Sequence, residues 1–270
     1  MNKGTVLFQL AAIFSIILIS MTSFAQDRIF TYTYQSGVLG KGQNEIEIWN
    51  TFRTGKKEFS NRIDTRAEFE TGLGGNFQTA FYLNYTSKSA QKNINGLKYL
   101  ESESEYSFSN EWKYKVSDAA ANSLGFALYG EYTIGTAEHE LETKFIFDKK
   151  FRKLTLAFNL SGELEYEKEI EDNEPEWKIT KKSDATFSAA YELNPHFHLT
   201  LESACRNRFS DKLESSALFT GAGFSYFADR FWANFTVLPQ LKAFKGATDN
   251  GLDLDNYDKL EFRLIFSYEL

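Results

Sequence analysis

The feature that most limits how this chain can fold is an alternation of apolar and polar residues with a period of two, which recurs along most of its length. Near the C-terminus, for example, Leu260, Phe262, Leu264, Phe266 and Tyr268 fall on one face. Successive side chains of a β-strand point to opposite faces, so such runs predict strands with one apolar side. Twelve runs can be traced, at residues 45–53, 62–73, 77–86, 100–116, 124–134, 140–147, 153–167, 177–192, 197–208, 217–227, 232–242 and 259–270.

The links between these runs show a second regularity. Links after even-numbered runs are tight, as at residues 74–76 and 148–150, whereas several after odd-numbered runs are long and polar, as at 87–96, 168–176, 207–214 and 244–258. Short turns at one end and longer loops at the other are typical of outer-membrane barrels. The pattern places both termini on the periplasmic side and the long loops outside.

A membrane barrel also accounts for the charged residues. Faces rich in Phe, Leu and Tyr stand opposite columns of charge in a chain with 25% charged and 16% aromatic residues. A soluble sandwich or lipocalin-like barrel would bury one of these faces in a dry core, at several kcal/mol per unpaired ion. A wet lumen and a lipid-facing exterior avoid that cost. The sequence therefore predicts an all-β fold, a transmembrane antiparallel up-and-down β-barrel of about 12 strands.

The N-terminal residues predict export. Lys3 precedes an apolar run over residues 6–19, and Ser23-Phe24-Ala25 forms a small-x-small cleavage site, which is the pattern of a secretory signal peptide. The predicted domains are a signal peptide at 1–25, an N-terminal extended segment at 26–41 and the barrel at 42–270. Whether the extended segment enters the lumen as a plug or adds to the wall is left open. The predicted location is the bacterial outer membrane.

The inward-facing charges divide into two predicted arcs across the mouth of the lumen. The basic arc contains Arg53, Arg62, Arg66, Lys178, Lys182, Arg206, Arg208, Lys259 and Arg263, and the acidic arc contains Glu101, Glu103, Glu105, Glu131, Glu140, Glu142, Glu163, Glu165 and Glu167. Facing arcs would set up a transverse field that orients polar solutes. The alternative is a zipper of neighbouring pairs, such as Arg62, Asp64 and Arg66, that closes the lumen. A net acidic excess would weakly favour cations.

Other classes of function have less support. Twelve-stranded outer-membrane phospholipases activate a serine with a neighbouring histidine, but the chain has no His-x-Ser and only His139 near an outer strand end. The acidic loop with Asp249, Asp253, Asp255 and Asp258 offers oxygens for Ca²⁺ but lacks the spacing and the glycine of an EF-hand, so a solvated loop is favoured. A single cysteine, Cys205, excludes a disulfide framework, and the pI of about 5.2 gives no reason to expect nucleic-acid binding. We expect no enzyme, no cofactor and no metal.

Aromatic residues near predicted strand ends are candidates for the interfacial girdles of a membrane barrel. They are Trp49, Tyr85, Trp112, Tyr132, Trp177, Tyr191 and Tyr226.

Three segments of the first third, at residues 42–53, 66–73 and 78–84, resemble a family of uncharacterised bacterial outer-membrane proteins. The resemblance implies a porin-like barrel without a defined substrate, and it carries over no catalytic residue. The predicted function is a small passive channel for hydrophilic or charged solutes, with outer-membrane lipid and small solutes as partners. The alternative is a structural or loop-binding barrel with a closed lumen, and an outer-membrane lipase or protease is less favoured.

Overall fold

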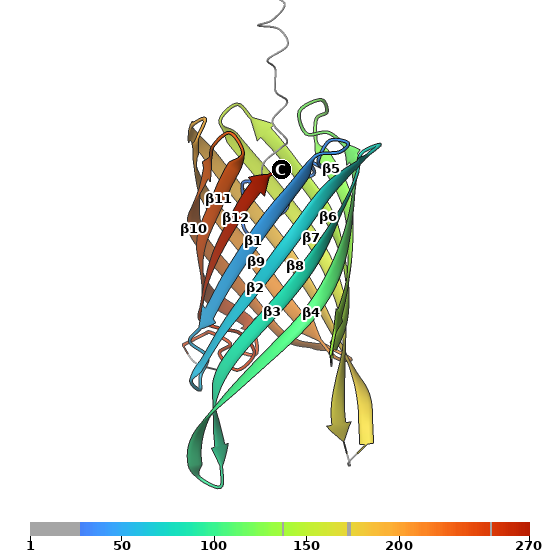
Figure 1. Cartoon of the computed structure of the whole chain (residues 1–270). Helices are drawn as coiled ribbons and strands as arrows, with labels where there is room; N and C mark the ends of the chain where they lie inside the picture. Colours follow the sequence, from blue (N-terminus) through green and yellow to red (C-terminus); the bar gives the residue numbers. More distant parts are fainter. Residues whose placement is uncertain (1–27, 137, 172–173, 249) are drawn as a thin grey trace, which may run out of the picture.

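The computed structural model describes residues 28–136, 138–171, 174–248 and 250–270. Within these residues the chain forms a closed barrel of twelve antiparallel strands, each paired with its sequence neighbours and the last with the first (Figure 1). The predicted up-and-down barrel is confirmed. The strands are β1 Asn44–Thr54, β2 Ser60–Gly74, β3 Phe77–Ile94, β4 Leu97–Ser117, β5 Gly125–Gly135, β6 Glu138–Phe151, β7 Leu154–Glu171, β8 Glu174–Asn194, β9 Phe197–Phe209, β10 Leu213–Phe227, β11 Phe231–Lys245 and β12 Leu260–Glu269.

The two ends of the barrel differ. One end carries the C-terminus and is called the periplasmic end below. The opposite end, called the outer end, carries long projecting hairpins (Figure 1). The predicted signal peptide, residues 1–25, lies outside the described residues, as do the first two residues of the predicted extended segment. The described part of the chain contains no helix long and apolar enough to cross a membrane.

Two predicted outer loops, 87–96 and 168–176, are instead arms of β-hairpins. Strands β3 and β4 stay paired out to Ile94 and Leu97, and β7 and β8 out to Glu171 and Glu174. The β3–β4 arm closes through Asn95 and Gly96, which both have positive φ (53° and 82°), as a two-residue hairpin turn requires. Beyond the bilayer both faces of an arm meet water, so no apolar alternation marks these residues as strand.

The outward faces of the strands are apolar, and aromatic side chains meet across neighbouring strands. Phe126 and Phe147 stack with ring centroids 4.9 Å apart, and Phe81 stacks on Phe108 at 6.3 Å. Leu83 is 67% exposed on this face. A closed ring of exposed apolar side chains matches the hydrocarbon region of a membrane.

The predicted girdle role of Trp49 is wrong. Its side chain is buried, at 6% exposure, and points into the lumen with Glu47 and Thr51. The parity of β1 explains this placement, because Ile46 and Ile48 occupy the lipid-facing positions and leave the odd-numbered residues inside.

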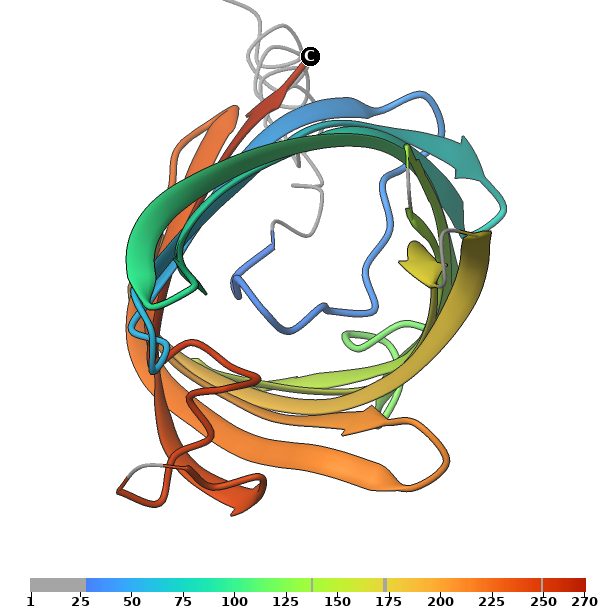
Figure 2. The same ribbon diagram turned by 90° about the horizontal axis from the view of Figure 1, so that it is seen from below.

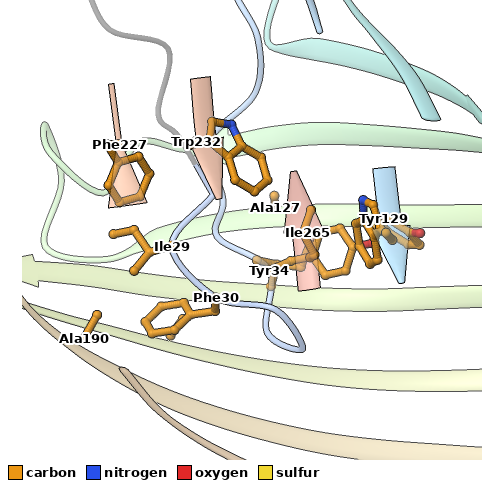
Figure 3. Packing of buried hydrophobic residues seen from close by; sticks show 12 residues of the cluster. Ile29, Phe30, Tyr34, Ala127, Tyr129, Ala190, Phe227, Trp232 and Ile265 are labelled. Carbon is orange, nitrogen blue, oxygen red and sulfur yellow. The ribbon is translucent and has the colours of Figure 1, made fainter. Parts of the chain in front are cut away.

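The N-terminal segment, residues 28–43, lies inside the barrel and crosses its lumen (Figure 2). Ile29, Phe30 and Tyr34 belong to one buried cluster with small wall residues such as Ala127 and Ala190 (Figure 3). The segment then reaches β2 at Gly72, where a Cβ would overlap the carbonyl oxygen of Gly40. Its main packing core is therefore in the periplasmic half of the lumen, and the segment is a plug rather than part of the wall.

Candidate functional site in the lumen

A charged cavity of about 650 Å³ occupies the outer half of the lumen. Tyr32 and Tyr34 of the plug lie at its inner limit. Fourteen of the predicted arc residues line it: Arg53, Arg62, Arg66, Lys182, Arg206, Arg208 and Arg263 from the basic arc, and Glu105, Glu131, Glu140, Glu142, Glu163, Glu165 and Glu167 from the acidic arc. The barrel therefore brings most of the two arcs together in one cavity.

Four predicted lumen residues do not line the cavity. Glu101 and Glu103 lie on the projecting arm of β4, beyond the barrel wall, and form ion pairs with Lys92 of β3. The hydrogen bond from the Lys92 ammonium lowers the pKa of the Glu101 carboxyl. The other two, Lys178 and Lys259, are exposed side chains on β8 and just before β12. The sequence analysis assumed that the alternating runs end at the membrane surface. For that reason it placed these four residues in the lumen.

Sequence reasoning also missed cavity residues. They are Lys56, Lys88, Glu138, Lys144, Asp184, Asp258 and Glu261, whereas Asp64, predicted as part of the zipper, lines the cavity as well. Some of them were predictable from strand alternation, because residues two apart face the same side of a strand. Lys144 is two residues from Glu142 on β6, and Glu261 is two residues from Arg263 on β12.

Ion pairs between neighbouring wall residues support part of the zipper interpretation. On the basic side Arg62 Nε lies 2.6 Å from Asp64, which also pairs with Arg53. Lys182 of the basic arc lies 2.6 Å from Glu163 of the acidic arc, which stands opposite it on the neighbouring strand. Wall residues of both signs thus neutralise one another locally.

Other contacts and charges do not fit a closed zipper. Arg66 of β2 reaches Glu131 of β5, 3.3 Å away across two intervening strands. Glu105, Glu138 and Glu140 have no cation within ion-pair distance among the described residues. The described cavity lining holds twelve carboxylates against ten basic side chains. The remaining excess is acidic and lies on β4 to β7.

Strand register arranges glutamates in a row that runs along the lumen wall. Glu111, Glu131, Glu142 and Glu163 stand opposite one another on β4, β5, β6 and β7. Because the strands of a barrel tilt, a row perpendicular to them climbs along the barrel axis. The row therefore leads from the periplasmic half into the outer cavity.

The plug is held by side chains of the wall that bind its backbone. Glu202 of β9 accepts hydrogen bonds from the backbone N–H groups of Thr31 (2.9 Å), Tyr32 (2.8 Å) and Thr33 (3.3 Å). The Asn159 side chain accepts from the N–H of Tyr34 at 2.6 Å and donates to its carbonyl at 3.0 Å. These bonds satisfy backbone groups that no strand ladder pairs, so the plug has a defined docked position.

A layer of aromatic and basic side chains fills the lumen where the plug crosses it. Arg28 lies over the rings of Tyr34 (3.9 Å) and Trp49 (4.2 Å), and Arg66 over Tyr82 (4.1 Å). A second pocket, of about 40 Å³, lies on the periplasmic side of this layer. Of the described residues only Tyr34 lines both spaces. The layer therefore separates the outer cavity from the periplasmic end.

The buried ion pairs of Glu261 should contribute to the stability of the barrel. Glu261 is 2% exposed and pairs with Arg206 and with Arg53, the latter at 3.5 Å. We expect Glu261→Ala to lower the free energy of unfolding by about 3 kcal/mol, because Arg206 and Arg53 each lose one counter-charge in a confined lumen and keep, among the described residues, only Asp184 and Asp64. Urea unfolding of the refolded barrel in detergent measures the change. Glu167→Ala, at the rim, is the control, and an equal loss in both variants would contradict the prediction.

Solved structures with a similar fold are outer-membrane barrels. The NanC porin aligns with a TM-score of 0.53 and 10% identity over 83% of this chain and 100% of its own. The KdgM porin, solved in complex with disordered oligogalacturonate, gives 0.50 and 9% over 84% and 99%. The translocator domain of the autotransporter NalP from Neisseria meningitidis gives 0.53 and 9% over 96% of each chain. At these identities the likeness concerns the fold.

Family membership follows from the sequence itself. No curated protein matches the chain. A family model does match, over residues 22–270, which covers the whole barrel together with the plug. The chain has the fold of an outer-membrane β-barrel and belongs to this family, DUF6662, a family of unknown function.

Proposed function

We propose that this protein is a channel of the bacterial outer membrane for small hydrophilic solutes, and that its plug restricts the periplasmic half. The observation that carries the proposal is the charged outer cavity of about 650 Å³, inside a wall whose outward face is apolar. A cavity lined by so many ionic groups has little affinity for apolar solutes but replaces part of the hydration of polar ones. The fold shared with two porins supports the same conclusion.

The distribution of charge points to weak cation preference. The excess carboxylates gather on β4 to β7, and the arginines gather on the opposite wall. Such a separation produces a field across the lumen that orients dipolar solutes, while the acidic excess raises the local concentration of cations. No catalytic step is part of the proposal, since the described contacts of His139 are with Tyr132 and Trp177.

The testing experiment is planar-bilayer conductance of the refolded full-length chain in a salt gradient. We expect small discrete steps and a reversal potential displaced toward the cation. Arg62→Ala combined with Arg66→Ala should displace it further, because the mutations remove two positive charges from the cavity wall. Lys92→Ala on the projecting arm is the matched control and should leave it unchanged. A double variant with unaltered selectivity would count against the field.

The structural or loop-binding barrel is the second candidate, and the plug itself favours it. A lumen filled at the periplasmic half and two projecting hairpins are what a surface-binding barrel would also need. Conductance distinguishes the two candidates. If the folded, heat-modifiable barrel shows no conductance steps even after its plug has been removed, the channel proposal is wrong.

A further inference from the structure

Five glutamates meet in the periplasmic half of the lumen, beside the plug. Glu45 and Glu47 come from β1, Glu68 and Glu70 from β2, and Glu111 from β4, and all are at most 9% exposed. Strand register places them together, since Glu45 stands opposite Glu70 and Glu47 opposite Glu68. Like charges directly opposite one another destabilise a sheet. This cluster therefore requires something that offsets the repulsion.

A small residue brings the fifth glutamate into contact with the others. Ala80 of β3 stands opposite Glu70 on one side and Glu111 on the other. Its methyl group leaves space above β3 in which the two longer side chains converge. The group Glu68, Glu70 and Glu111 has carboxylate oxygens within 4.8 Å of one another, and so has the group Glu45, Glu47 and Glu70. Glu70 is common to both groups.

Two basic side chains, Arg28 and Lys113, line the same pocket as Glu70, but neither lies within ion-pair distance of the described carboxylates of the cluster. Among the described residues, none of the five carboxylates has a cation within 4.0 Å. The guanidinium of Arg28 donates instead to the carbonyls of Phe30 (2.8 Å) and Thr31 (3.0 Å). Unpaired carboxylates buried in this way cost several kcal/mol each.

Two oxygens of the cluster also lack a hydrogen-bond partner within the protein. They are Oε2 of Glu68 and Oε1 of Glu111, on side chains that are 3% and 0% exposed. Donors reach other oxygens of the cluster, as Trp49 Nε1 does at Glu47 (2.6 Å). Buried polar atoms are almost always paired, so the two free oxygens indicate an additional partner.

We propose that this cluster binds a divalent cation, with Ca²⁺ as the best fit and Glu70 as the central ligand. Calcium takes six to eight oxygen ligands at about 2.3–2.6 Å, so oxygens on opposite sides of one ion lie roughly 4.8 Å apart. The pocket of about 40 Å³ next to Glu70 leaves room for water ligands that complete the coordination. Bound at the group of Glu68, Glu70 and Glu111, where the two unpartnered oxygens lie, the ion would join β2 and β4 in the periplasmic half, whether or not the barrel conducts.

The test uses Tb³⁺, a luminescent substitute for Ca²⁺, on the refolded full-length barrel in detergent. The indoles of Trp49 and Trp232 donate hydrogen bonds to Glu47 and Glu45, so excitation of tryptophan should sensitise a bound ion. We expect saturable emission that Ca²⁺ displaces, and a higher melting temperature in Ca²⁺ than in EDTA. Glu70→Gln should weaken Ca²⁺ affinity at least tenfold, whereas Glu140→Gln in the outer cavity should leave it unchanged.

Protonation of the carboxyls is the alternative to cation binding, since it would also remove the repulsion. It predicts the opposite outcome of this test. In that case Ca²⁺ displaces no emission, and Glu70→Gln, which mimics a neutral carboxyl, leaves the barrel as stable or more stable. Either result, or a Glu70→Gln variant with unchanged Ca²⁺ affinity, overturns the proposal. If Glu70→Gln fails the heat-modifiability check for folding, Glu68→Gln replaces it, with a smaller expected loss because Glu68 belongs to only one group.

Discussion

Deletion of residues 28–41, which removes all but the last two residues of the plug, is expected to raise the single-channel conductance severalfold and to lengthen the open state. The plug and the layer around Arg28 and Tyr34 separate the outer cavity from the periplasmic end. Without the plug, the polar wall residues that bind its backbone would line a continuous wet lumen, as in wider porins. Planar-bilayer recording of both proteins, refolded in the same way, measures the difference.

A point variant provides the control for loss of folding. The buried Glu202 carboxylate accepts three backbone N–H groups of the plug, and hydrogen bonds to a charged group contribute about 1.5–3 kcal/mol each. Glu202→Ala should therefore favour the undocked plug by several kcal/mol, and about 2.8 kcal/mol already corresponds to a hundredfold change in population. Its openings should be more frequent than in the unmodified chain. If the deletion variant folds but its conductance is unchanged, the plug does not limit conductance.

The wall of the barrel was predictable because one physical requirement repeats in every strand. A lipid-facing side chain must be apolar and its neighbour must face the lumen, so the period of two appears in each run and the closed sheet follows. The same requirement ends where the membrane ends. Residues 87–94 of β3 stay paired with β4 although they were predicted as loop, because an arm with water on both faces needs no apolar alternation.

The interior was much less predictable, because its contacts join residues that are far apart in the chain. Glu202 and Thr31 are separated by 171 positions, and Asn159 and Tyr34 by 125. Nothing in the local pattern of residues 28–43 says which wall residues they contact. The arcs were predicted from parity alone, which places a side chain inside but not beside a particular partner. Register then decides that Glu45 stands opposite Glu70, and Glu131 opposite Glu142.

A disulfide between the plug and the barrel wall should hold the plug in its docked position. The hydroxyl oxygens of Thr33 in the plug and Ser188 in β8 are 2.6 Å apart and buried, so cysteines at both positions are close enough for a disulfide. We expect the Thr33→Cys, Ser188→Cys variant to lose its openings under oxidising conditions and to recover them in dithiothreitol. Cys205→Ala serves as the background, so that the new pair holds the only two thiols of the chain.

This locked variant separates two roles of the plug. If the plug moves to open the lumen, the disulfide abolishes conductance and the reductant restores it, while either single cysteine behaves like the background. If solutes instead pass beside a docked plug, the disulfide changes nothing, because the covalent bond only fixes a position that is already occupied. Equal conductance before and after reduction, with the disulfide verified by thiol titration, would therefore assign residues 28–43 to the permanent wall of a narrow pore and not to a gate.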